Sequence, residues 1–486
     1  MSNDIKKLNP NALWENFYAI NQVPRGSKKE AKIIKYMKAF GESLGLETVV
    51  DKIGNVIIKK PATKGMEDRR TVVLQSHLDM VHQKNSDTNF DFDKDAIKMI
   101  IDGDWVTADG TTLGADNGIG VSAIMAILQS KDITHPAVEA LFTIDEETGM
   151  TGAEFLDESV LTGDILLNLD SEDDDELTIG CAGGVNTNVF MDYTSEKVPA
   201  DYKAFDIVIK GLKGGHSGVD IHLGRGNANK LMTRLLHKMF PKFGMKISYF
   251  NGGNLRNAIP REAFATVVVQ PAKVDKFLKE FDRRAKDIRA EYKSIEDGMV
   301  ISVTEAKLPK EMLNTRSQNR ILNALYTVPN GVHRMSPDIP DLVETSSSLA
   351  TVKIKDGKFI SESLQRSSIE SGKEDILLAV RAAFELAGAK VKNDGSYPGW
   401  APDTDSAILG TMVQQYTDLF DEKPKVAACH AGLECGIIGT HYPKMDMISF
   451  GPTIKNPHSP DEKVNIPSVE KFWKFLLNTL KETPRK

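Results

Sequence analysis

Short apolar runs, each ended by polar or charged residues, recur in the first and last parts of the chain. Four of these runs have the length and composition of buried strands: residues 71–74, 138–144, 164–169 and 446–450. Elsewhere in these parts, apolar residues recur at helical spacing, as in residues 33–44. Ser27 and Glu30, just before this segment, have the spacing of a capping box. This pattern predicts an α/β fold in which a mixed sheet is flanked by helices.

The pattern changes in the middle of the chain. A strand at residues 205–209 leads into a glycine-rich turn and a helix, and two strands at 349–354 and 359–364 face each other across the turn Asp356-Gly357. The earlier pattern returns after Trp400. We therefore predict that residues 1–186 and 394–486 form one domain and that residues 187–393 form an inserted α+β domain.

Composition narrows the choice of partners and compartment. The 486 residues are enough for two domains, and the formal net charge of −7 with scattered Lys and Arg argues against nucleic acid or an anionic membrane as partner. No stretch reaches the roughly 20 apolar residues of a membrane span. The three cysteines, Cys181, Cys429 and Cys435, do not form a disulfide framework. We therefore expect a cytoplasmic protein.

Acidic and imidazole side chains follow the predicted strands. His77 and Asp79 come directly after residues 71–74, and residues two apart on an extended segment point the same way. This arrangement is typical of a metal-binding histidine that a carboxylate orients. Asp116 lies in a glycine-rich turn before a helix, where it could also act only as a helix cap. A phosphate-binding loop is a poorer interpretation, because no Gly-Lys-Ser/Thr follows.

Five such side chains, from five separate loops, form a plausible ligand set for two divalent ions such as Zn²⁺, with Mn²⁺ or Co²⁺ as substitutes. They are His77, Asp116, Glu147, Asp170 and His458. Two cations close together polarise a carbonyl group and activate a shared water, so such a site hydrolyses amides. Glu146, beside Glu147, is the candidate general base. A thiolate site at Cys429 and Cys435, which flank His430, is a less complete alternative.

These motifs, in this order, resemble the M20 family of di-zinc peptidases. The resemblance is carried by His77-Leu78-Asp79, Gly114-Ala115-Asp116-Asn117-Gly118, Glu146-Glu147-Thr148-Gly149, Asp170-Ser171-Glu172, Gly214-Gly215-His216-Ser217-Gly218 and Pro457-His458-Ser459-Pro460. Within the family, residues 256–263 and 430–436 are similar to the bacterial aminoacyl-histidine dipeptidases. The likeness extends nearly from end to end.

The resemblance implies a role for each matched residue. Asp116 would bridge the two zinc ions, with His77 and Asp170 on one ion and Glu147 and His458 on the other. Glu146 would be the general base that takes a proton from a metal-bridging water to form the attacking hydroxide, and Asp79 would orient His77. The peptide bond after Asp116 is expected to be cis.

For the inserted domain, the resemblance implies a lid over a catalytic domain. His216 would stabilise the oxyanion, while Asn257, Arg366 and Gly432 would contact the dipeptide, Arg366 through its terminal carboxylate. His430 and Glu434 are expected near the substrate without an assigned step. The resemblance allows a homodimer through the lid domain as well as a monomer, and it leaves open whether His216 acts within its own chain or across subunits.

The function so implied is that of a cytosolic di-zinc dipeptidase. It would hydrolyse unblocked dipeptides, above all Xaa-His types such as β-alanyl-histidine. Two alternatives stay open: an N-acyl-amino-acid deacylase of the same architecture, and a binding protein of this fold that has lost catalysis. The second predicts erosion among the ligands or the base, and none of them is missing from the sequence.

Overall fold

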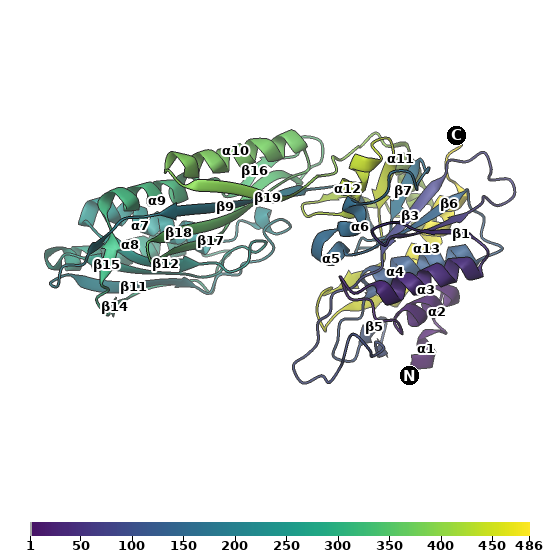
Figure 1. Cartoon of the computed structure of the whole chain (residues 1–486), viewed down its shortest axis with the longest axis horizontal. Coiled ribbons are helices and arrows are strands. Elements are labelled where there is room, and N and C mark those ends of the chain that lie inside the picture. The colour runs from purple at the N-terminus through teal and green to yellow at the C-terminus, as the bar shows by residue number, and fades with distance from the viewer. Residues whose placement is uncertain (1) are drawn as a thin grey trace. The chain divides into compact units, whose positions relative to one another are not determined.

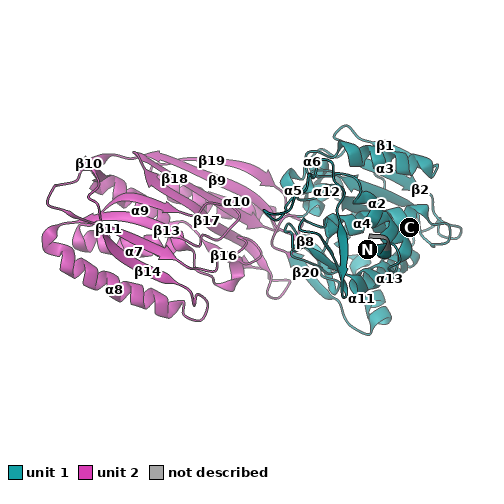
Figure 2. Cartoon of the chain, turned by 90° about the horizontal axis from the view of Figure 1, so that it is seen from below, with its two compact units in different colours: residues 1–180, 402–428, 433–486 teal, residues 181–401, 429–432 magenta. Residues whose placement is uncertain are grey.

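The structure is a computed structural model that describes residues 2–486 and contains two compact units (Figures 1 and 2). Unit 1 comprises residues 1–180, 402–428 and 433–486, and unit 2 comprises residues 181–401 and 429–432. Unit 1 is therefore built from both ends of the chain. None of the helices within residues 2–486 has the length and apolar character that a membrane crossing needs.

Unit 1 is organised around an eight-stranded mixed sheet. Its strand order is β1-β2-β6-β3-β7-β21-β8-β20. The central strands β6, β3, β7 and β21 run parallel, and the flanking pairs β1–β2, β2–β6 and β21–β8 are antiparallel. Every residue of β3 is buried, as expected for a central strand that is covered on both faces. The strands are β1 (Glu47–Val50), β2 (Val56–Lys60), β3 (Val72–His77), β6 (Val138–Thr143), β7 (Ile165–Asn168), β8 (Glu176–Cys181), β20 (Lys425–Cys429) and β21 (Asp446–Ser449).

Helices cover this sheet, and a small second sheet lies beside it. Helix α4 packs on β3 and on α2, α3 packs on β1, and α11 packs on β21 and α13. The helices are α1 (Ser2–Ile5), α2 (Asn11–Ile20), α3 (Ala31–Ser43), α4 (Ala115–Gln129), α5 (Glu146–Gly149), α6 (Thr151–Glu154), α11 (Ala407–Phe420), α12 (Glu434–His441) and α13 (Ile466–Lys481). The small sheet has the order β22-β23-β5-β4, with β4 (Met99–Asp102), β5 (Trp105–Ala108), β22 (Ile454–Lys455) and β23 (Lys463–Asn465).

Unit 2 is a nine-stranded antiparallel sheet with four long helices. The order is β14-β11-β13-β12-β17-β18-β9-β19, and β16 also pairs with β17. Helices α7–α10 share one apolar core with the sheet. The strands are β9 (Gly183–Asp192), β11 (Lys203–Lys210), β12 (Lys246–Gly252), β13 (Ala263–Val269), β14 (Val300–Ala306), β16 (Gly331–Met335), β17 (Val343–Lys355), β18 (Lys358–Ser367) and β19 (Lys390–Tyr397). The helices are α7 (Ala228–Phe243), α8 (Val274–Glu291), α9 (Thr315–Thr327) and α10 (Glu370–Leu386), and β10 (Ser195–Lys197) pairs with β15 (Glu311–Leu313).

The predicted α/β fold, with its mixed sheet flanked by helices, is confirmed. The four apolar runs are β3, β6, β7 and β21, and the predicted facing strands are the β17–β18 hairpin, which turns at Asp356-Gly357. The apolar runs were therefore sufficient to find the four parallel strands of the eight-stranded sheet.

The predicted capping box at the start of α3 is wrong. The helix begins at Ala31, and neither of the two predicted capping side chains bonds to its first turn. The hydroxyl of Ser27 donates to Asp79 Oδ2 at 2.8 Å, and Glu30 Oε1 accepts from the backbone N–H of Lys28 and Asp145 at 2.8 and 3.1 Å. Both side chains therefore tie the chain before α3 to the loops at the end of the sheet.

Candidate active site

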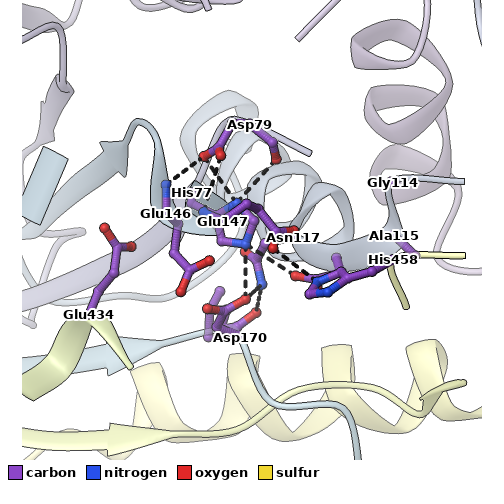
Figure 3. Close-up of polar contacts among 12 residues, drawn as sticks. His77, Asp79, Gly114, Ala115, Asn117, Glu146, Glu147, Asp170, Glu434 and His458 are labelled. Carbon is purple, nitrogen blue, oxygen red and sulfur yellow. Dashed lines mark hydrogen bonds and ion pairs between the residues drawn. The ribbon is translucent and has the colours of Figure 1, made fainter. Parts of the chain in front are cut away.

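The candidate ligands of unit 1 lie at one edge of the central sheet (Figure 3). His77 ends β3, Glu147 lies in the short helix after β6, and Asp170 follows β7. Because β6, β3 and β7 are adjacent and parallel, their carboxyl ends place these three side chains together. Asp116 joins them from the first turn of α4, and His458 joins them from the loop after β22.

These five side chains form two overlapping groups that share Asp116. One group is His77, Asp116 and Asp170, and the other is Asp116, Glu147 and His458; within each group the ligand atoms lie within 4.8 Å of one another. Asp116 Oδ1 is 3.1 Å from His77 Nε2, and Asp116 Oδ2 is 3.2 Å from His458 Nε2. One carboxylate therefore presents an oxygen to each group. The peptide bond between Asp116 and Asn117 is cis, as the resemblance predicted.

The surroundings of these groups suit a pair of cations. Glu147 Oε1 is buried and has no hydrogen-bond partner in the described part of the chain, which is costly for a carboxylate that receives no ligand. Hydrogen bonds that the His458 ring donates to Asp116 and Glu147 raise the pKa of His458 to about 11, and burial raises the pKa of Asp170 to about 6. Two imidazoles and three carboxylates are a donor set that zinc accepts, so the residues fit a two-metal site.

Asp79 connects His77 to the loop after β6. Its Oδ1 lies 3.4 Å from His77 Nδ1 and accepts from the backbone N–H of Glu146 at 3.0 Å. The His77 ring is also 3.1 Å from the backbone carbonyl of Asp79. Burial raises the pKa of Asp79, but hydrogen bonds, led by that from His77, outweigh burial and leave the pKa below its usual value. Asp79 is thus placed to orient the ring and to hold the acidic loop.

Glu146 lies beside the ligand groups, and its carboxyl group extends between those of Asp170 and Glu434 (Figure 3). Burial raises its pKa well above the usual value, and the nearby charges of Asp170, Glu147 and Glu434 add to this effect. A carboxylate in such surroundings binds a proton more readily than one in water.

Two of the predicted residues of unit 2, His216 and Arg366, lie close together. His216 Nδ1 accepts from the backbone N–H of Gly218 and Val219 at 3.2 and 3.0 Å, so the ring proton lies on Nε2. That nitrogen is 3.5 Å from Nη2 of Arg366, whose Nη1 donates to the hydroxyl of Tyr397 at 2.8 Å. Burial, with the charge of Arg366, lowers the pKa of His216 to about 4. Two N–H donors therefore face each other, an arrangement that an anion between them would stabilise.

The other residues of unit 2 that were predicted to contact the substrate are Asn257 and Gly432. Asn257 is exposed, and its backbone carbonyl accepts from Ser217 N at 2.8 Å. Gly432 is half-buried in the segment 429–432. In the same segment His430 Nε2 lies 2.7 Å from Ser346 Oγ, while its Nδ1 is buried without a partner among the described residues. Tyr397 and Ser346 were not predicted, because neither belongs to a motif with a recognisable spacing.

Comparison with known proteins identifies the family. The model of "Peptidase family M20/M25/M40" matches residues 73–482, which include every candidate ligand. The chain belongs to this peptidase family. The predictions of an M20 metallopeptidase, and of an enzyme that is a hydrolase, are therefore confirmed.

Two relatives match this M20-family chain over nearly its whole length. It is 43% identical to the cytosol non-specific dipeptidase of Escherichia coli over 99% of the chain and 100% of the relative. The crystal structure of aminoacylhistidine dipeptidase from Vibrio alginolyticus matches with a TM-score of 0.93 and 45% identity, covering 99% of this chain and 98% of that one. The aminopeptidase PepT of Bacillus cereus has 18% identity and a TM-score of 0.57, and shares the fold.

A buried polar network beneath the ligands of this peptidase escaped sequence reasoning. Gln75 and Thr143, from adjacent strands, both donate to Glu434 Oε2 at 2.6 Å. Asn168 in turn donates to Gln75, so the network crosses three strands. Glu434 Oε1 is buried with no partner in the described residues. The resemblance had placed Glu434 near the substrate, but nothing in the sequence related it to Gln75 and Thr143.

Glu434 makes stability depend on pH. Burial raises its pKa from 4.5 to about 8 in the folded protein, so the stability it contributes below pH 4.5 is lost as the pH rises to about 8. Replacing Glu434 with glutamine is expected to raise the free energy of unfolding of the metal-free protein at pH 9 by a few kcal/mol, since one pKa unit corresponds to about 1.4 kcal/mol. At pH 4.5 the two proteins should be nearly equal. Denaturant unfolding at both pH values checks this, and an equal difference at both would contradict it.

Proposed function

We propose that this chain is a cytosolic di-zinc dipeptidase that hydrolyses unblocked dipeptides. The observation that carries the proposal is the pair of ligand groups that share Asp116, because a bridging carboxylate is what two adjacent cations require. The names of the two full-length relatives, both dipeptidases, support the substrate class and, for the Escherichia coli protein, the compartment.

The ligands in this proposal are His77 and Asp170 for one zinc ion and Glu147 and His458 for the other, with Asp116 shared. Their support is the short separations from each imidazole to its carboxylates: His77 Nε2 is 3.4 Å from Asp170, and His458 Nε2 is 2.9 Å from Glu147. When bound, the two ions would polarise the scissile carbonyl and make water a stronger acid.

The chain's own side chains supply the proton transfers. Glu146 takes the proton of the attacking water and gives it to the amine that leaves, a role that its raised pKa favours. Asp79 keeps the His77 ring and the backbone of Glu146 in place. Each step therefore uses a group whose position is fixed by a hydrogen bond or by burial.

Unit 2 offers donors for the negative charges of a dipeptide. His216 would donate its Nε2 proton to the oxyanion, and Arg366, held by Tyr397, would bind the terminal carboxylate. Asn257 and Gly432 are proposed as further substrate contacts. A neutral His216 suits this role, because it keeps one ring nitrogen as a donor at neutral pH.

A dipeptide panel tests the proposal. We expect β-alanyl-histidine, leucyl-histidine and alanyl-glycine to be cleaved, cleavage to stop after chelation, and zinc to restore it. Preference for the histidine-containing peptides would agree with the name of the Vibrio alginolyticus protein, whereas equal rates would agree with the "non-specific" name of the Escherichia coli protein. Cleavage of an N-acetylated amino acid alone would replace the dipeptidase with a deacylase.

A homodimer is proposed as the assembly. Gel filtration gives the oligomeric state, and mixing inactive His216→Ala chains with inactive Glu146→Ala chains tests whether subunits share a site. Recovered activity would mean that His216 acts across subunits. Absence of recovery in a mixed dimer would assign His216 to its own chain.

A further inference from the structure

A buried carboxylate, Glu462, holds the turn that carries Asp116. Its Oε2 accepts from the backbone N–H of Leu113 and Gly114 at 2.8 and 2.9 Å, and its Oε1 accepts from Ala115 and Asp116 at 2.7 and 3.3 Å. Glu462 is 2% exposed. Four successive N–H groups therefore converge on one side chain. Glu462 also lies four residues after His458, so it ties two of the candidate ligand segments together.

A buried guanidinium, Arg25, holds the other side of the same turn. Its Nη2 donates to the carbonyl of Gly114 at 2.6 Å, and its Nη1 donates to the carbonyls of Leu78 and Asp79, both at 3.2 Å. Those two carbonyls directly follow His77 at the end of β3. Arg25 thus links the turn of Asp116 to the strand of His77. Burial lowers its pKa to about 10, which still leaves it charged at neutral pH.

Arg25 and Glu462 meet at Gly114. Burial raises the pKa of Glu462 to about 7, whereas the backbone N–H groups that donate to both of its oxygens favour the ionised form. The N–H of Gly114 donates to Glu462, and the carbonyl of Gly114 accepts from Arg25. The two side chains therefore hold the two peptide groups on either side of this residue. Gly114 has a φ of +70°, and a Cβ atom there would lie 2.4 Å from Nη2 of Arg25. Only glycine lets the guanidinium approach so closely. We call Arg25, Gly114 and Glu462 the Gly114 clamp.

Such a clamp has a physical use beside a metal site. Three carboxylates placed within a few ångströms repel one another before any cation binds, and the loops that carry them would move apart unless something else held them. Hydrogen bonds to charged groups contribute more than those between neutral groups. Seven of them connect the segments that carry His77, Asp116 and His458: four are accepted by Glu462, and three are donated by Arg25 to backbone carbonyls. Arg25 donates a further bond to Asn21 at 3.2 Å.

We infer that Arg25 and Glu462 are positioning residues that hold Asp116, His77 and His458 in the arrangement two metal ions need. The inference rests on the metal centre of the proposed function. Its deciding measurement, the zinc affinity of the metal-free protein, needs no substrate, so failure of the clamp and failure of the dipeptidase proposal give different results.

The test compares Glu462→Gln with a matched control, Glu139→Gln. Glu139 is also a buried carboxylate that holds a loop, accepting from the N–H of Thr162 and Gly163 at 2.8 and 3.0 Å, and it lies outside the ligand groups. In either variant an NH₂ group faces backbone donors, so both are expected to lower the melting temperature. Zinc affinity of the metal-free proteins is then measured by competition with a chromogenic chelator.

We expect Glu462→Gln to weaken zinc binding by about 10–100-fold, as the loss of a residue that orients metal ligands does. The Glu139→Gln variant should bind zinc as the unchanged protein does. Excess zinc should restore turnover to Glu462→Gln, which a purely structural defect would not allow. Unchanged zinc affinity in folded Glu462→Gln, or an equal loss in the control, would overturn the inference.

Two further variants keep the test decisive if Glu462→Gln does not fold. Glu462→Asp retains the charge but is one methylene shorter, and Arg25→Lys retains the charge but loses the fork that reaches several carbonyls. Each should weaken zinc binding, and because both act on Gly114, their combined effect should differ from the sum of the single effects. Wild-type zinc affinity in both variants would also refute the clamp.

Discussion

Replacing Glu146 with glutamine is expected to lower kcat by about 10²–10⁴-fold, the usual contribution of a positioned acid/base group. Glutamine keeps the size of the side chain but cannot take a proton from water. Since Glu146 lies outside both groups that share Asp116, the variant should bind zinc with the affinity of the unchanged protein. Steady-state kinetics on a cleaved dipeptide and zinc titration of the metal-free variant measure the two effects separately.

A nearby exposed acid provides the control for this variant. Glu154, in the next short helix, is exposed, and Glu154→Gln should retain full activity. Turnover of Glu146→Gln within tenfold of the unchanged enzyme would remove Glu146 from the role of base. A loss of zinc together with a loss of turnover would instead show that Glu146 is a ligand. Glu146 could then bind a cation together with His77 and Glu147, whose ligand atoms lie within 4.8 Å of its own.

Replacing Asp116 with asparagine is expected to remove both metal ions and at least about 10³-fold of the activity, because metal ions contribute several kcal/mol to such reactions and 1.4 kcal/mol is a factor of ten. Each oxygen of Asp116 faces a different imidazole, so a single substitution affects both ligand groups. An amide nitrogen has no lone pair to offer a cation. Elemental analysis after dialysis gives the number of retained ions.

Asp170→Asn is the comparison for Asp116→Asn. Asp170 belongs to the group that contains His77 and not to the group that contains His458, so this variant should lose one ion and keep the other. Retention of one tightly bound ion by Asp116→Asn would show that Asp116 does not bridge. Loss of both ions from Asp170→Asn would show that the two sites fill only together.

Local pattern was sufficient to predict the parallel strands of the unit 1 sheet and the loops that follow them, but not its strands β8 and β20. The strands β3, β6 and β7 are apolar runs of ordinary length, and the rule that parallel strands present their carboxyl ends at one edge brought His77, Glu147 and Asp170 together. Asp116 and His458 were added to this set because they complete a donor set for two cations, and the family resemblance then assigned the ligands to each ion. Neither residue directly follows a strand of the central sheet, so the strand pattern alone could not place it.

The supporting contacts could not be predicted, because they join residues that are far apart in the sequence. Glu462 accepts from Leu113, 349 positions earlier, and Gln75 donates to Glu434, 359 positions later. No periodicity relates such pairs. The same cause explains the error at Ser27 and Glu30, whose spacing suits a capping box while their partners, Asp79 and Asp145, come from other loops.

The place of β21 in the sheet has a consequence for synthesis of the chain. This strand pairs with β7 on one side and β8 on the other, although both neighbours are made more than 260 residues earlier. Until β21 has been made, the chain therefore lacks the strand that lies between β7 and β8. Translation must reach His458 before the fifth ligand exists. The set of five candidate ligands therefore stays incomplete until residues well beyond 77–170 have been made.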